Sequence, residues 1–195
     1  GIPVVETWDL TPAPIDMLIG FSHEKIGAAV VEHFAQRGRR RLAALTGDDP
    51  RALRRKDGYV QAARARGLAW DDLDGLPTAI VRAPTTAGSG RTGLLDLLAR
   101  HPDVDAIFCS SDLLALGVLI EARQQGVDVP GRLAVVGFGD LAMARDFEPA
   151  LTTVRIDGTS IGRLAARFIV DRAEGREVAQ RIVDVGFSIV PRAST

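Results

Sequence analysis

Short apolar runs alternate with amphipathic stretches along most of the chain, and this alternation limits the possible folds more than any other feature. The apolar runs expected to be strands lie at 17–20, 42–45, 78–81, 104–109 and 133–136. Stretches of helical period follow them, at 22–38, 51–66, 90–100 and 112–125. Uniformly apolar strands separated by helices are typical of parallel β-α-β units covered on both faces. The sequence therefore predicts an α/β fold, a doubly wound parallel sheet, from about residue 21 to 150.

The C-terminal part of the chain departs from this pattern. Residues 152–156 predict a strand, 160–173 a helix, and 181–189 a last strand rich in β-branched side chains. The opening run at residues 2–5 also has no place in the central repeat. We expect the opening strand and this tail to belong to a second lobe, whose other half would precede residue 1.

Charge and cysteine content narrow the class of protein. The 195 residues carry 24 basic and 25 acidic side chains, so this segment predicts no nucleic-acid-binding face of its own. Cys109 is the one cysteine, which excludes an internal disulfide and favours a reducing, cytoplasmic setting. It lies in an apolar run, and because thiols buried in such runs are usually inert, the sequence disfavours a nucleophilic role. No apolar run is long enough to span a bilayer, so no membrane partner is predicted.

Four loops follow the predicted strands, at 47–55, 83–90, 110–112 and 137–140. In open parallel sheets, ligands bind where the carboxyl ends of the strands and such loops converge. The loops carry hydroxyls, carboxylates and an arginine, which together suit a small polyhydroxylated or acidic ligand held by hydrogen bonds.

Each of these polar residues also has a structural interpretation. Asp112 precedes an apolar helix and would serve equally as its N-cap. Arg55 stands between two other basic residues on a solvated helix face, and Thr85 would equally face water. His23 and His33 have no partner at metal-ligand spacing, so no metal site is predicted.

A glycine-rich segment at 88–93 matches the G-x-G-x-x-G pattern of dinucleotide-binding loops. Such a loop begins directly after a strand, whereas residues 83–87 intervene here. A P-loop lysine and a G-x-S-x-G nucleophile elbow are both missing from the sequence. A nucleotide-dependent enzyme remains an alternative, but the sequence predicts no catalytic residue and no cofactor.

Several segments, in their order and spacing, resemble the effector-binding domain of lac-repressor/galactose-repressor (LacI/GalR) transcription regulators. They are 20–24 with 31–34 and 38–40, 42–47, 55–59, 108–112 with 115–117, 135–138, and 151–154. Residues 3–6 and 184–188 are similar to the gluconate-repressor branch. The resemblance covers the chain from about residue 17 to its end.

This resemblance implies two lobes of the periplasmic-binding-protein type joined by three crossovers, near 19–22, 153–157 and 178–182. Residues 1–20 and 156–179 would be a remnant of the N-terminal lobe, which is incomplete here. Residues 21–155 and 180–195 would form the C-terminal lobe. A DNA-binding headpiece, absent from this chain, would contact operator DNA.

The resemblance also implies site residues. Ligand contacts fall on Arg55, Thr85, Ser111, Asp112, Phe138, Asp140 and Phe21. Family members often carry a carboxylate where Gly139 stands, so its absence favours an effector with a carboxylate of its own, such as gluconate, paired with Arg55. A homodimer face would include Leu116, Leu119, Ile120 and Phe147, which would also suit a helix-to-sheet core.

The function that follows is effector sensing and dimerisation in a DNA-binding regulator, a repressor, that responds to a small sugar or sugar acid. The effector acts by binding one arrangement of the lobes more tightly than the other. A periplasmic-type sugar-binding protein of a transport system is the alternative with the same fold.

Overall fold

The computed structural model describes residues 2–68, 70 and 75–195. The chain divides into two compact units. The first consists of Gly1–His23 and Ile156–Ser188, and the second of Glu24–Arg155 and Ile189–Thr195. No helix in the described part of the chain has the length and apolar character needed to cross a bilayer.

The second unit is built on a six-stranded sheet of order β4-β3-β5-β6-β7-β9. The strands are β3 (Leu42–Gly47), β4 (Thr78–Val81), β5 (Ala106–Cys109), β6 (Ala134–Phe138), β7 (Thr152–Arg155) and β9 (Ser188–Val190). The neighbours from β4 to β7 pair in parallel. β3, β5 and β6 are almost wholly buried, as the uniformly apolar runs predict for a sheet covered on both faces.

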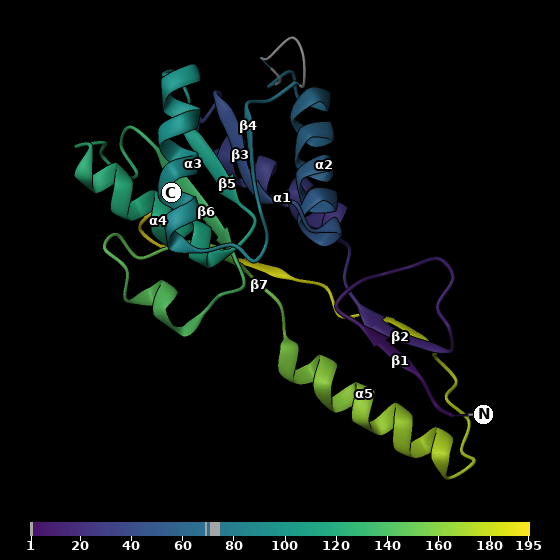
Figure 1. The fold of residues 1–195 in the computed structure, drawn as a ribbon. Coiled ribbons are helices and arrows are strands. Elements are labelled where there is room, and N and C mark those ends of the chain that lie inside the picture. The colour runs from purple at the N-terminus through teal and green to yellow at the C-terminus, as the bar shows by residue number, and fades with distance from the viewer. Residues whose placement is uncertain (1, 69, 71–74) are drawn as a thin grey trace. The chain divides into compact units, whose positions relative to one another are not determined.

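Helices cover this sheet on both sides. Figure 1 shows α1 (His23–Gln36) and α2 (Pro50–Ala65) on one face, and α3 (Ala87–Arg100) and α4 (Asp112–Gln124) on the other. An apolar cluster lies beneath α3 and α4, where alternate residues of β3, β5 and β6 meet Leu94, Leu97 and Leu114. The predicted doubly wound parallel sheet is confirmed.

Glycine pairs set the helices close together. A Cβ on Gly27 would lie 2.3 Å from the Arg55 carbonyl oxygen, and a Cβ on Gly58 would lie 2.4 Å from that of Glu24. Such approaches exclude any side chain larger than hydrogen, so α1 and α2 cross at these residues. This crossing fixes the part of α2 that carries Arg55.

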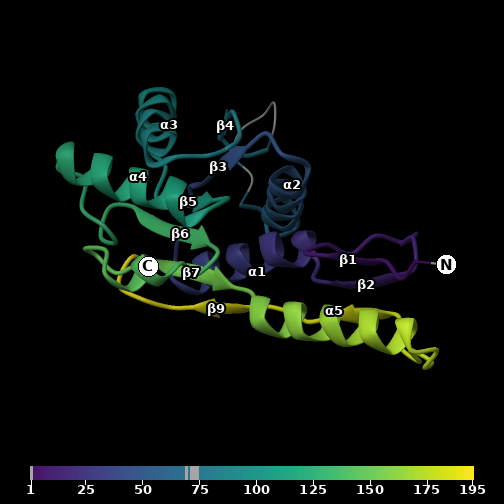
Figure 2. The same cartoon turned by 60° about the horizontal axis from the view of Figure 1, so that its bottom comes forward.

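The first unit contains a three-stranded parallel sheet of order β1-β2-β8. Its strands are β1 (Val5–Thr7), β2 (Met17–Gly20) and β8 (Ile182–Asp184), and α5 (Gly158–Ala173) packs on β1 and β2 (Figure 2). The Arg172 guanidinium reaches Asp16 at 3.1 Å within this unit.

Some predicted boundaries differ from the structure. The single strand expected at 181–189 is two strands in different sheets, because β8 pairs with β2 whereas β9 adjoins β7. The third division between the units therefore falls at 188/189 instead of 179/180, and the first falls at 23/24 instead of 20/21. The opening strand occupies Val5–Thr7 instead of residues 2–5.

Candidate functional site

The four predicted loops follow the carboxyl ends of β3, β4, β5 and β6, and three of them lead into helices through side-chain caps. Asp49 accepts from the amide of Ala52 at the start of α2. Thr86 forms a capping box with Ser89 at the start of α3. Each cap holds the first turn of its helix at this edge of the sheet, which we call the carboxyl edge.

Arg55 is held on α2 by contacts within the second unit. Its side chain is buried, with the residue 6% exposed. One terminal nitrogen donates to the Ser110 carbonyl oxygen at 3.0 Å, and the guanidinium carbon lies 3.9 Å from the centroid of the Phe138 ring. This is a close cation–π stack. The structure therefore brings two of the predicted ligand residues, Arg55 and Phe138, into contact.

Thr85 and Ser111 form a hydroxyl pair at the same edge. Their side-chain oxygens are 3.0 Å apart, and both residues are half-buried. Ser111 is also the N-cap of α4, where its oxygen accepts from the amide of Leu114 at 3.2 Å. Two hydroxyls with spare donor and acceptor capacity suit recognition of ligand hydroxyls.

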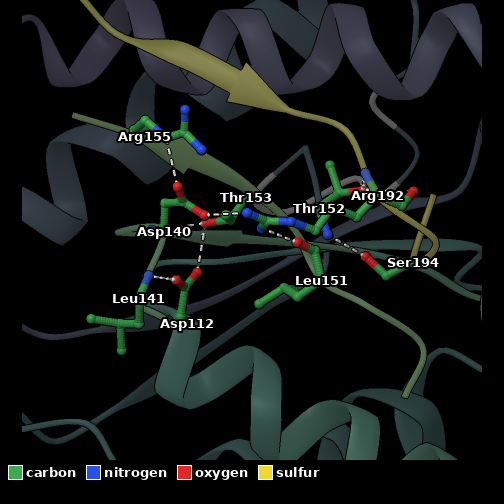
Figure 3. Close-up of polar contacts among 9 residues, drawn as sticks. All are labelled: Asp112, Asp140, Leu141, Leu151, Thr152, Thr153, Arg155, Arg192 and Ser194. Atoms are coloured by element: carbon green, nitrogen blue, oxygen red, sulfur yellow. Dashed lines mark hydrogen bonds and ion pairs between the residues drawn. The ribbon is translucent and has the colours of Figure 1, made fainter. Parts of the chain in front are cut away.

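Asp112 is not the cap that the sequence allowed, because Ser111 has that role. Instead its buried carboxylate accepts from the Thr153 hydroxyl at 2.6 Å and from the Leu141 amide at 2.7 Å (Figure 3). Burial raises the pKa of Asp112, although these two hydrogen bonds oppose the shift. Both oxygens serve the chain itself, so Asp112 shapes the loop after β6.

Asp140 is also engaged within the chain. One oxygen accepts from Arg155 Nε at 2.6 Å and the other from Arg192 Nη2 at 2.6 Å (Figure 3). Burial alone would raise the pKa of Asp140, but the hydrogen bonds from Arg192 and Arg155 lower it below its usual value. The residue has φ +50°, in the left-handed region that aspartate tolerates better than most residues.

The sequence did not single out Arg155, Arg192 or Thr153, although all three contact a predicted site residue. For Arg155, the order of the predicted strands could have indicated its position. If the strand at 152–156 lies beside the strand before Gly139, residue 155 falls at the carboxyl edge of the sheet. The contacts of Arg192 come from the C-terminal segment and follow no local pattern.

The remaining predicted residues are Phe21 and the four residues of the expected dimer face. Phe21 belongs to the first unit and is buried there, edge-on to Trp8 and His23. Of the expected dimer face, Leu119 is 5% exposed and part of the apolar cluster, and Phe147 packs against that cluster. Leu116 is half-buried, and Ile120 is 42% exposed.

The glycine-rich segment and the cysteine have structural roles. Gly88 and Gly90 lie inside α3, so the segment is not a strand-to-helix phosphate loop. A Cβ on Gly90 would lie 2.2 Å from the Leu114 carbonyl oxygen, where α3 crosses α4. Cys109 is fully buried, and burial raises the pKa of its thiol, which disfavours the nucleophilic thiolate.

Comparison with known proteins agrees with this fold. Residues 31–195 match the family model of periplasmic binding protein-like domains. The chain is 36% identical, over its full length, to the HTH-type transcriptional regulator GntR of Pseudomonas aeruginosa, of which it covers 56%. The chain thus spans about half the length of the curated relatives it matches.

Solved structures give the same result. Transcription regulator GntR from Chromobacterium violaceum has a TM-score of 0.91 and 39% identity, over 98% of this chain and 69% of that one. A LacI family regulator from Silicibacter pomeroyi has a TM-score of 0.88 and 30% identity, over 98% and 69%. A CelR–cellobiose complex has a TM-score of 0.85 and 29% identity, over 99% and 59%. The chain belongs to the LacI family of transcriptional regulators, within its periplasmic-binding-protein-like domain.

Proposed function

We propose that this chain is the effector-sensing part of a transcriptional repressor and binds a sugar or sugar acid at the carboxyl edge of the second unit. The observation that carries the proposal is the convergence of Arg55, Phe138, Thr85 and Ser111 at that edge, on a fold shared with LacI-family regulators. An aromatic face beside hydroxyls and a guanidinium is a combination that suits a small polyhydroxylated ligand.

The class of effector follows from the charges at the edge. The carboxylates of Asp112 and Asp140 both accept hydrogen bonds from other groups of the chain, and Gly139 contributes no side chain. Arginines at the edge therefore favour a ligand that brings its own negative charge. CelR, a relative, is known in complex with the neutral sugar cellobiose. We propose a sugar acid, with gluconate as the first to test.

The proposed mechanism is thermodynamic linkage. Effector binding favours one conformation of the regulator, and operator DNA, contacted through a headpiece outside residues 1–195, favours another. The regulator would act in the cytoplasm, where both partners are found. The effect of the ligand on DNA binding is then limited by the difference in its affinity for the two conformations.

Dimerisation is part of this proposal. Ile120 on α4 and Leu141 and Met143 at η1 (Ala142–Arg145) are 40–42% exposed, and Leu116 on α4 is half-buried. Exposed apolar side chains of this kind are typical of a surface that a second subunit covers. Leu119 and Phe147 would support this face from the apolar cluster beneath it.

Titration calorimetry on the complete gene product tests the proposed effector class. We expect D-gluconate to bind with measurable heat, and D-glucitol, which has a CH2OH group in place of the carboxylate, to bind more weakly. NAD and ATP should give no heat. A signal from NAD or ATP but none from gluconate would favour the nucleotide-dependent alternative. Gluconate binding without any affinity for DNA would favour a transport-linked binding protein.

A further inference from the structure

Arg155 is the last residue of β7, at the carboxyl edge of the sheet. Its Nε is hydrogen-bonded to Asp140 Oδ2 at 2.6 Å, and its side chain is 51% exposed. Within the described part of the chain, Arg155 makes no other side-chain hydrogen bond. The bond to Asp140 thus restrains the guanidinium through Nε and leaves its two terminal nitrogens without a hydrogen-bond partner in the described residues, so their planar fork can still bind a carboxylate.

The charges around Asp140 do not cancel. Arg192 Nη2 donates to the other oxygen of Asp140 at 2.6 Å, and its Nη1 donates to the Leu151 carbonyl oxygen at 2.7 Å. The Arg192 side chain is only 14% exposed. One carboxylate therefore faces two guanidinium groups, and the positive charge that remains lies on the more exposed arginine, Arg155.

Gly139 lies beside Arg155. Phe138 pairs with Val154 in the parallel register of β6 and β7, and the Gly139 amide donates to the Val154 carbonyl oxygen at 2.9 Å. The next residues along the two strands are Gly139 and Arg155. Gly139 is exposed, and a Cβ placed on it would meet only Asp112 Oδ2 at 3.7 Å and Leu141 Cγ at 4.0 Å. Position 139 thus leaves open space next to a restrained guanidinium.

Arg55 differs from Arg155 in these respects. Arg55 is buried, bonded to the Ser110 carbonyl oxygen and stacked on Phe138, so it is placed to support a ligand-binding surface. Arg155 has more exposed surface, and its two terminal nitrogens make no hydrogen bond within the described residues. We propose that Arg155 determines specificity for acidic effectors by binding the ligand's carboxylate in the space beside Gly139. This inference rests on the proposed function and names the residue behind the preference for a sugar acid.

Calorimetry with D-gluconate and D-glucitol tests this role in Arg155→Gln, in Arg155→Lys and in the control Arg123→Gln. Arg123 is an exposed arginine in the last turn of α4, far along that helix from the carboxyl edge. We expect the wild type and Arg123→Gln to prefer gluconate by roughly tenfold or more, a difference typical of a charge-assisted bidentate pair. Arg155→Gln should lose the preference and retain its glucitol affinity, and Arg155→Lys should keep part of it.

Substitution at Gly139 provides a second test. Gly139→Asp would place a carboxylate of the chain beside Arg155, so it should weaken gluconate binding. Gly139→Ala is the matched control, because φ is +129° at this position and any side chain adds strain. If Gly139→Ala and Gly139→Asp weaken gluconate binding equally, backbone strain explains the effect. That result would contradict the proposed role of Arg155.

The outcomes separate the two proposals. A gluconate preference that persists in Arg155→Gln overturns the role of Arg155 and leaves the proposed effector class intact. Equal binding of gluconate and glucitol by the wild type overturns both the acidic class and this role. Thermal unfolding of each variant in the absence of ligand verifies that it is folded before it is titrated.

Discussion

The Thr153 hydroxyl donates a hydrogen bond of 2.6 Å to Asp112 Oδ1, and this bond joins β7 to the first turn of α4. The second oxygen of Asp112 accepts from the amide of Leu141, in the loop after β6. One buried carboxylate therefore connects three segments at the edge where the ligand is proposed to bind.

Asp112→Asn should destabilise the second unit. An amide offers one acceptor oxygen where the carboxylate offers two, so either the Thr153 hydroxyl or the Leu141 amide loses its acceptor. We expect the free energy of unfolding to fall by about 1–3 kcal/mol, the cost of a buried donor without an acceptor. Urea unfolding measures it, with the exposed Asp103→Asn as control. Equal stability of the two variants would show that the Asp112 carboxylate is not needed.

Acid should weaken the Asp140 cluster. Burial opposes ionisation of Asp140, but the hydrogen bonds from Arg192 and Arg155 lower its pKa below the ordinary 3.8. A lowered pKa in the folded chain stabilises that chain above pH 3.8, and the stabilisation is lost as the pH falls through the folded-state pKa. Between about pH 5 and 2, the unfolding free energy of the wild type should therefore fall more steeply than that of Asp140→Asn. Parallel curves would contradict the pairing.

Tyr59→Phe should stabilise the chain. Tyr59 is fully buried between Phe34 and Phe108, and in the described structure its hydroxyl has no hydrogen-bond partner. Removing the hydroxyl removes a desolvation cost of about 1–3 kcal/mol while the ring contacts remain. Thermal unfolding should show a higher midpoint for the variant. A lower midpoint would mean that a bound water or another group satisfies the hydroxyl.

Two glycines of α3 should differ in how much an added methyl group changes the stability of the chain. Gly90→Ala should cost more than about 2 kcal/mol, because its Cβ would lie 2.2 Å from the Leu114 carbonyl oxygen and the backbone would have to move. Gly88→Ala has only Thr86 Oγ1 at 3.6 Å and should gain up to about 1 kcal/mol from helix propensity. Chemical unfolding of both variants checks the contrast. Similar effects at the two positions would argue against the close crossing of α3 and α4.

The parallel units and the four loops could be predicted from the sequence because apolar runs and helix caps are local signals. The double contact of Asp112 could not, since its partner Thr153 lies 41 residues away and its type gives no hint of the pairing. The segment at 181–189 shows the same limit. Its β-branched residues predict strands, but no local signal says that β8 and β9 join different sheets.

The ligand contacts stay a prediction, but the structure shows which of the named side chains contact one another. The sequence named Arg55 as a ligand contact from its resemblance to a family, and the structure shows it on α2, stacked on Phe138. The sequence also named Asp140 as a ligand contact, and in the structure its carboxylate accepts hydrogen bonds from Arg155 and Arg192. Those two arginines come from β7 and the C-terminal segment, and only the folded sheet brings them to the same carboxylate.

The affinity of the complete gene product for DNA upstream of its own gene, measured by fluorescence anisotropy as D-gluconate is added, tests the central claim most directly. A coupling of 1–3 kcal/mol, typical of allosteric regulators, predicts a change in DNA affinity of about 5- to 150-fold. Arg155→Gln should need a higher gluconate concentration to produce that change. A DNA affinity that stays constant at gluconate concentrations that saturate the protein would contradict the claim that this chain senses an effector for a DNA-binding regulator.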